Sequence, residues 1–226
     1  IWQEDEVNAP FVDANGQTNG KTNGEVYKVK PGNSKYVDIN KDGVYNDADQ
    51  GIIGCGQPTF NWGWNNTFNY KNFDFSFFVV GFHGFDIYNA THQMGYNLIK
   101  SQQVAGVTPM RELLNRWTPT NTNTNIPGFV NGGTENKDFF STRFVENGSF
   151  IKMKSITLGY TLPETACRAL GITNLRVYAS VQNPFHITNY SGLDPEATMG
   201  SPLVQGVDWG SYPNSRNYLI GLNFSF

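Results

Sequence analysis

A short segment rich in acidic and amide side chains has the spacing of a calcium-binding loop. It reads Asp38-Ile-Asn-Lys-Asp-Gly-Val-Tyr-Asn-Asp-Ala-Asp49. EF-hand loops place oxygen ligands at alternating positions around an invariant glycine and close with an acidic residue. The candidate metal ligands are Asp38, Asn40, Asp42, the carbonyl of Val44, Asn46 and Asp49, and the candidate cofactor is Ca²⁺.

Two interpretations of this loop stay open. Hard cations prefer such an oxygen cage, but Asp, Asn and Gly also build tight turns without any metal. The last ligand position holds Asp49, where an EF-hand carries a longer, bidentate Glu, so full coordination is not assured. The spacing is equally similar to that of dockerin loops, although no second copy follows.

The remaining reactive residues do not form a catalytic constellation. His83, His92 and His186 are scattered, and the sequence has no His-Glu-x-x-His, Gly-x-Ser-x-Gly or phosphate-binding glycine motif. Asp194 and Glu196 suggest a glycosidase pair, but acidic pairs are common in loops. We therefore do not expect an enzyme.

Two loop aromatics and two cysteines need a structural context. Trp209 and Tyr212 are suited to stacking on sugar rings or on a partner protein, but loop aromatics also pack a loop onto itself. We expect Cys55 and Cys167 to be unpaired thiols, because the strand pattern described next places them at opposite ends of a sheet.

Alternating sequences predict five β-strands. From residue 60 to 70, bulky aromatics occupy one parity and Asn, Gly and Thr the other. A two-residue turn at 71–72 leads into a second such strand, whose pattern becomes irregular at Phe78 and Val80. Further alternating segments cover residues 149–162, 175–182 and 218–226, the last ending at Phe226. The fold class is therefore all-β and antiparallel.

The connections between these strands distinguish a membrane barrel from a soluble sandwich. Short links (71–72, 163–171) alternate with long ones (83–148, 183–215), as in outer-membrane barrels with short periplasmic turns and long extracellular loops. We expect one short helix near residues 110–117 within the first long link. Composition agrees: aromatic residues make up 15% and charged residues 15%, and the net charge of −3 argues against nucleic acid.

In a barrel, the polar parity of these strands would face the lumen. The lumen-facing residues would then include Asn61, Asn65, Thr67, Asn69, Asp74, Arg176, Tyr178 and Gln182. Lys152 and Lys154 are exceptions, because they share the lipid-facing parity of Ile156. Either that strand rises above the bilayer before Ile156, or a β-bulge resets its register, and we favour the first explanation.

The pattern divides the chain into two parts. Residues 1–57 form a polar loop region with the calcium-loop motif and a small hairpin from Glu25 to Asp38, whereas residues 58–226 hold the barrel strands. The sequence has no run of about 18 apolar residues, so it predicts no membrane-spanning helix.

Several segments together resemble the C-terminal part of the SusC/RagA family of TonB-dependent outer-membrane transporters. They are Lys35-Tyr-Val-Asp-Ile-Asn-Lys-Asp-Gly43, Tyr70-Lys-Asn-Phe-Asp-Phe-Ser-Phe-Phe78, Asp86-Ile-Tyr-Asn89, Arg116-Trp-Thr-Pro119, Arg143-Phe-Val-Glu-Asn-Gly-Ser-Phe150, Leu158-Gly-Tyr-Thr-Leu-Pro163, Ser191-Gly-Leu-Asp-Pro-Glu196 and Tyr218-Leu-Ile-Gly-Leu-Asn-Phe-Ser-Phe226. Each segment is weak alone, but their common order makes the resemblance specific, and it covers nearly the whole chain.

This resemblance implies a large plugged barrel that imports glycans or peptides with energy passed through TonB. It also implies a SusD-like lipoprotein partner at the outer loops, a periplasmic C-terminus, and a plug and TonB-contacting segment that lie N-terminal in the family and that we do not find here. Five strands cannot close a lumen of 22 strands, so the remaining strands must complete it. The alternative is a secreted, calcium-dependent, carbohydrate-binding β-sandwich.

Overall fold

The chain folds as two compact units. The computed structural model describes residues 1–96, 110–128, 140–169, 171–199 and 205–226. One unit comprises Ile1–Ile53 and Gln93–Ser141, and the other comprises Gly54–His92 and Thr142–Phe226. No helix in the described parts of the chain is long and apolar enough to cross a membrane.

The first unit consists of short helices and loops around a small aromatic core. Its elements are α1 (Glu4–Asn8), α2 (Asn23–Tyr27), η1 (Asp47–Asp49) and η2 (Arg111–Asn115). The helix η2 confirms the helical turn expected near residues 110–117. The expected hairpin from Glu25 to Asp38 is wrong, because Thr22 and Glu25 cap each other's backbone and begin α2 instead.

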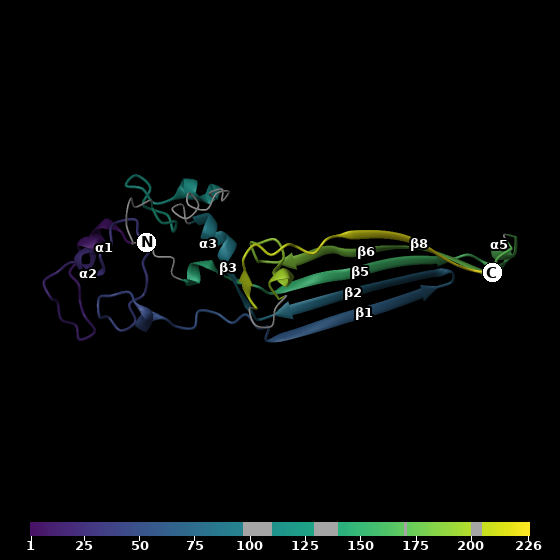
Figure 1. The fold of residues 1–226 in the computed structure, drawn as a ribbon, viewed down its shortest axis with the longest axis horizontal. Coiled ribbons are helices and arrows are strands. Elements are labelled where there is room, and N and C mark those ends of the chain that lie inside the picture. Colours follow the sequence, from purple (N-terminus) through teal and green to yellow (C-terminus); the bar gives the residue numbers. More distant parts are fainter. Residues whose placement is uncertain (97–109, 129–139, 170, 200–204) are drawn as a thin grey trace. The chain divides into compact units, whose positions relative to one another are not determined.

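The second unit is dominated by one antiparallel sheet of five long strands, which confirms the all-β expectation (Figure 1). Its order is β1-β2-β5-β6-β8, so each long strand pairs with the next long strand along the chain. The bounds are β1 (Phe60–Tyr70), β2 (Phe73–His83), β5 (Phe150–Thr161), β6 (Asn174–Thr188) and β8 (Asn217–Ser225).

Short and long connections lie at opposite ends of this sheet. The turn at residues 71–72, the short helix α5 (Glu164–Ala169) and the C-terminus share one end, which we call the short-turn end (Figure 1). The other end, the long-loop end, carries a small second sheet of β4 (Val145–Asn147), β3 (Asp86–Asn89) and β7 (Val207–Asp208). The remaining elements are α3 (Ala90–Tyr96), η3 (Thr142–Phe144) and η4 (Pro195–Met199).

A β-bulge interrupts the central strands and corrects one sequence interpretation. Met153 and Ser155 of β5 pair with Phe185 and Gln182 of β6, so Lys154 lies outside the ladder. The bulge moves Lys152 to the face opposite Ile156. Our expectation that the strand rises above the bilayer before Ile156 is therefore wrong as the explanation for this lysine. The bulge also lets β6 continue to Thr188, beyond residue 183 where we expected the loop to begin, because a bulge tolerates a proline such as Pro184 inside a strand.

A small apolar core covers one face of the sheet at the long-loop end. It joins Val80 of β2 and Phe150 of β5 to Phe85, Ile87 and Tyr190 from the connecting segments. Val80 and Phe150 lie on the face that is polar elsewhere. The irregular alternation near Val80 therefore marks the point where the loops fold onto that face.

Candidate functional site

One face of the five-stranded sheet is apolar and exposed over its whole length. Trp64 on β1 is 54% exposed and Ile220 on β8 is 85% exposed. The same face carries the exposed side chains of Phe60, Phe68, Tyr70, Phe73, Leu158, Phe185, Ile187, Tyr218, Leu222 and Phe224. A β-sandwich would bury such a face against a second sheet, whereas in the described residues it stays open.

The height of this face fits a membrane. From residue 60 to residue 70, β1 rises ~3.4 Å per residue and so spans ~34 Å. A barrel strand tilts by ~40°, which reduces the span to ~26 Å along the membrane normal. The apolar band of an outer-membrane barrel is ~25 Å tall, so the apolar face has the dimension that a bilayer requires.

All eight residues that we predicted to face a lumen share the opposite face, which we call the polar face. The strand register aligns Asn65 with Phe78, Ser155 and Gln182, and aligns Asn69 with Asp74, Gly159 and Tyr178. The same parity includes Asn61, Thr67 and Arg176. The alternation of the sequence was thus sufficient to select the residues of this face.

The polar face carries an ion pair near the short-turn end. Arg176 donates two hydrogen bonds to Asp74, from Nε to Oδ1 at 2.9 Å and from Nη2 to Oδ2 at 2.5 Å. Its guanidinium also lies 5.0 Å from the ring centroid of Tyr178. A Cβ atom on Gly159 would approach Asp74 Oδ1 to 2.3 Å, and one on Gly221 would approach the Tyr178 ring equally closely. These two glycines therefore make room for the cluster.

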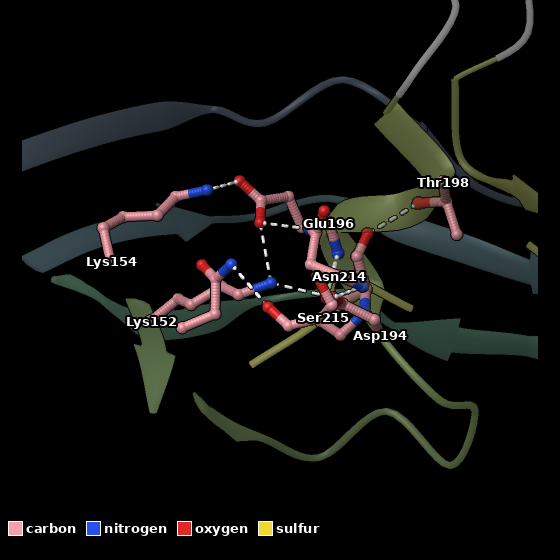
Figure 2. Close-up of polar contacts among 9 residues, drawn as sticks. Lys152, Lys154, Asp194, Glu196, Thr198, Asn214 and Ser215 are labelled. Atoms are coloured by element: carbon pink, nitrogen blue, oxygen red, sulfur yellow. Dashed lines mark hydrogen bonds and ion pairs between the residues drawn. The ribbon is translucent and has the colours of Figure 1, made fainter. Parts of the chain in front are cut away.

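A second charged cluster lies at the long-loop end, where η4 meets β5 (Figure 2). Lys152 is 2% exposed, and its Nζ lies 2.8 Å from Asp194 Oδ2 and 2.7 Å from Glu196 Oε2. Lys154, the bulge residue, pairs with the other oxygen of Glu196. We call these four residues with Asn214 the loop anchor.

The carboxylates of the loop anchor are held in their charged form. Burial opposes ionisation of Asp194, but hydrogen bonds from Lys152 and from the backbone of Asn214 outweigh it and lower the pKa of Asp194. Burial opposes ionisation of Glu196 as well, and hydrogen bonds from Lys152 and Lys154 lower its pKa. Both carboxylates are ionised and paired with lysines. Glycoside hydrolysis needs one protonated and one ionised carboxyl group, so the arrangement does not resemble a glycosidase pair.

The calcium-like loop has an ordered set of internal hydrogen bonds. Asp38 Oδ2 accepts from the Gly43 N–H at 2.9 Å, and Asp49 Oδ1 accepts from the Ile39 N–H at 2.8 Å. Asp38 Oδ1 is buried with no hydrogen-bond partner. Hydrogen bonds from the backbone of Asn46 lower the pKa of Asp49, and Asn46 itself accepts from the Ala48 N–H.

The other predicted ligands sit along the same turn, but the set is not gathered into a cage. Asn40 Oδ1 accepts from the Asp42 N–H, and Asp42 Oδ1 accepts from the Val44 N–H. Among the described residues, no three His, Cys, Asp or Glu side chains converge closely enough to hold a metal ion. Amide and carbonyl oxygens of the loop would have to supply the remaining ligands of a cation.

The last long loop carries the two predicted aromatics on a fixed turn. Tyr190 donates to Asp208 Oδ2 at 2.5 Å, and burial together with this bond raises the pKa of Tyr190. Asp208 Oδ1 accepts from the backbone N–H groups of Gly210 and Ser211. Trp209 is largely exposed beside this turn, and Tyr212 is 90% exposed. Both rings are available to a partner or ligand.

The cysteines lie where the strand pattern placed them. Cys55 accepts a backbone hydrogen bond from Asp86 of β3 at the long-loop end, whereas Cys167 lies in α5 at the short-turn end. Both are free thiols, Cys55 exposed and Cys167 buried.

Comparison with known proteins shows which family the chain belongs to. No protein-family profile matches the chain. It is 35% identical to the TonB-dependent receptor P3 of Formosa agariphila over 202 residues, which cover 87% of this chain and 19% of the receptor. It is 30% identical to the TonB-dependent receptor SusC of Bacteroides thetaiotaomicron, over 87% of this chain and 18% of SusC. The chain belongs to the SusC/RagA family of TonB-dependent receptors.

Solved structures of this family agree with the assignment. The RagAB peptide transporter matches 76% of the chain and 17% of its own chain, with a TM-score of 0.63 and 27% identity. The RagAB peptide importer in its open-open state matches 84% of the chain with a TM-score of 0.64 and 25% identity. The five strands are therefore a section of an outer-membrane barrel wall, as the sequence predicted. The chain spans about a fifth of the length of the curated relatives that it matches.

Sequence reasoning missed how the charged residues of this SusC/RagA chain combine. It selected Asp74 and Arg176 as lumen residues but did not pair them, because they lie on strands far apart in sequence. It considered Asp194 and Glu196 only as a catalytic pair. The usable signal was two lysines on an apolar parity, since a charge in such a strand needs a partner.

Proposed function

We propose that this chain is the C-terminal part of the wall of a TonB-dependent outer-membrane transporter that imports glycans or peptides. One observation carries the proposal: the sheet has an exposed apolar face of bilayer height and an opposite face of amides, hydroxyls and paired charges. A channel wall needs both faces. Its action is gated passage of a solute, without bond making or breaking.

The polar face would line the lumen. Asn61, Asn65, Thr67 and Asn69 are exposed along β1 and present neutral donors and acceptors. Such groups suit the hydroxyls of a glycan and the amides of a peptide equally well. The Asp74–Arg176 pair is neutral overall, so this part of the wall favours neither sign of charge.

The connections support an orientation in the membrane, and the family relationship suggests the partners. The short-turn end with Phe226 would face the periplasm, and the long-loop end would face outward, as short and long links do in outer-membrane barrels. The outer loops would meet a SusD-like lipoprotein, with Trp209 and Tyr212 as candidate contacts. The receptor's N-terminal region would supply the plug and the contact with TonB, and its remaining strands would close the barrel.

The loop from Asp38 to Asp49 would bind Ca²⁺ as a second property of the chain. The supporting observation is that backbone N–H groups already orient Asp38, Asp42 and Asp49, while Asp38 Oδ1 stays unpaired. A cation in this loop would satisfy that oxygen. The site would stabilise the loop and would not act on the transported solute.

Cell fractionation and uptake test the transport proposal. The full-length receptor should require detergent for extraction and migrate faster on gels when unheated, as folded barrels do. Uptake of one oligosaccharide or peptide from a panel should depend on both TonB and the SusD-like partner. A receptor that is fully soluble without detergent would refute the barrel assignment, and uptake that persists without TonB would refute the energy coupling.

A further inference from the structure

The loop anchor places a buried positive charge on a membrane strand. In the folded chain, Lys152 is the second residue before the bulge at Lys154, and this bulge turns its side chain onto the polar face. There the side chain is covered almost completely, although the lumen lies on the same side. Only the last loop, which comprises residues 189–199 and 205–216 among those described, supplies carboxylates to it (Figure 2).

Both arms of the last loop are tied to this one lysine. Asp194 lies in the first arm, immediately before η4, and accepts hydrogen bonds from the N–H groups of Glu196 and Asn214. Asn214, in the second arm, also donates from its side chain to Glu196 Oε2 at 2.9 Å. In the bulge, Asn183 donates to the carbonyl of Ser215. Lys152 and the bulge thus gather the two ends of the loop at one point.

The same segment is also held to the wall by apolar contact. Tyr190, which lies five residues before the start of η4 at Pro195, packs with Phe150 and Val80 on the polar face of β5 and β2. The loop therefore folds inward, over the inner side of the wall, and does not extend away from the sheet. Charge pairing and apolar packing act on the same stretch of loop.

A buried lysine with two carboxylates behaves as a single unit. Each charge is costly to bury alone, and removal of one member leaves the others buried without a partner. Asp194 has no alternative cation among the described residues, because Lys154 reaches only Glu196. Without Lys152, the Asp194 carboxylate would be more stable in water than in its buried position. Exposing it requires the loop to detach from the sheet.

We propose that Lys152 is the positioning residue of a latch that keeps the last loop folded inside the mouth of the barrel and narrows it. This inference rests on the proposed function, since a mouth exists only in the complete barrel. The latch is a fixed constriction and not a mobile lid. Its expected role is to restrict the access of large solutes to the part of the lumen that lies above the plug.

The test uses the full-length receptor with two matched variants. Lys152→Met keeps most of the length of the side chain and removes the charge. Lys154→Met makes the same change at a neighbouring, partly exposed lysine, which among the described residues pairs with Glu196 and not with Asp194. Hydrogen exchange followed by mass spectrometry reports on peptides that contain Glu196 and Asn214, whose N–H groups are bonded to Asp194. Labelling of Asn61→Cys, an exposed position on the polar face near the long-loop end, by a bulky maleimide in whole cells reports on the constriction, and mass spectrometry of its peptide separates it from the exposed Cys55.

Lys152→Met should accelerate exchange in both loop peptides by ~100-fold or more. The closed loop would then hold the Asp194 carboxylate buried without its cation, and this cost favours opening of the loop. Lys154→Met should change the exchange rate by less than ~10-fold. Labelling of Asn61→Cys should become several-fold faster with Lys152→Met and not with Lys154→Met, at equal amounts of folded receptor. If Lys152→Met fails to fold, Asp194→Asn replaces it and should show the same pattern.

Two outcomes would overturn the latch. Equal exchange in Lys152→Met and wild-type receptor would show that Lys152 does not hold the loop. Faster exchange without faster labelling of Asn61→Cys would show that the held loop does not restrict the mouth. Failure of the proposed function would appear differently, as a receptor absent from the outer membrane, and exchange in the purified protein would still report on the anchor.

Discussion

Trp64 and Asn65 are sequence neighbours that the sheet assigns to opposite environments. Both are exposed on β1, Trp64 on the apolar face and Asn65 on the polar face. Trp64 lies near the middle of the ~26 Å span, so its side chain would meet the centre of the bilayer. Replacing each residue by lysine in the full-length receptor applies one change to both faces.

We expect Trp64→Lys to destabilise the receptor and Asn65→Lys to be nearly neutral. A lysine at the bilayer centre of a barrel costs about 2–4 kcal/mol. Loss of the edge-to-face contact between Trp64 and Phe77, whose ring centroids are 5.1 Å apart, adds about 0.5–1.5 kcal/mol. The expected difference between the two variants is therefore about 3–5 kcal/mol.

Urea unfolding of the receptor in lipid vesicles measures this difference. The folded fraction is read from the heat-sensitive migration of the barrel on gels, and Trp64→Ala separates the lost aromatic contact from the added charge. A larger loss of stability for Asn65→Lys than for Trp64→Lys would refute the assignment of faces, and with it the position of the lumen residues.

Three further results are expected. Gly159→Ala should destabilise the receptor by about 1–2 kcal/mol, because the new Cβ would collide with Asp74, and unfolding in urea would show it. Calorimetric titration should detect Ca²⁺ binding that Asp38→Ala and Asp42→Ala abolish, and heat that survives both substitutions would contradict the loop site. Because the pKa of Asp194 is lowered, its ion pair with Lys152 should stabilise the last loop fully above about pH 4 and be lost as pH falls below that value. The protection of the loop amides, measured against their intrinsic exchange rates, should therefore decrease only in acid.

The regular part of the fold was predictable because the alternation within each strand shows which of its residues share a face. A strand with aromatics on one parity and amides on the other can bury or expose only whole faces, so local pattern decides membership of a face. The five strands and the residues of the polar face followed from this rule. The two-residue turn at 71–72 followed as well, since such turns fix the register of a hairpin.

The charged clusters were not predictable, because they depend on pairing between distant segments. Asp74 and Arg176 meet through the intervening β5, and Lys152 meets Asp194 through a loop that no periodic pattern describes. The bulge was decisive in the second case. An insertion of one residue into a ladder leaves no sign in composition or hydropathy, and only the misplaced lysines indicated it.

The bulge at Lys154 also governs how changes in this protein should be compared with its relatives. On the two sides of residue 154, β5 is read in opposite phase: even numbers face lipid after it, as at Ile156, and odd numbers face lipid before it, as at Met153. Deleting Lys154 would leave a regular ladder in which Met153 and Ser155 keep their faces, whereas deleting a neighbouring residue while the bulge remains would move the outer part of the strand to the opposite face. In a relative, an alignment gap at residue 154 would therefore mean the loss of the bulge and of one lysine of the loop anchor, with the faces of all other residues unchanged.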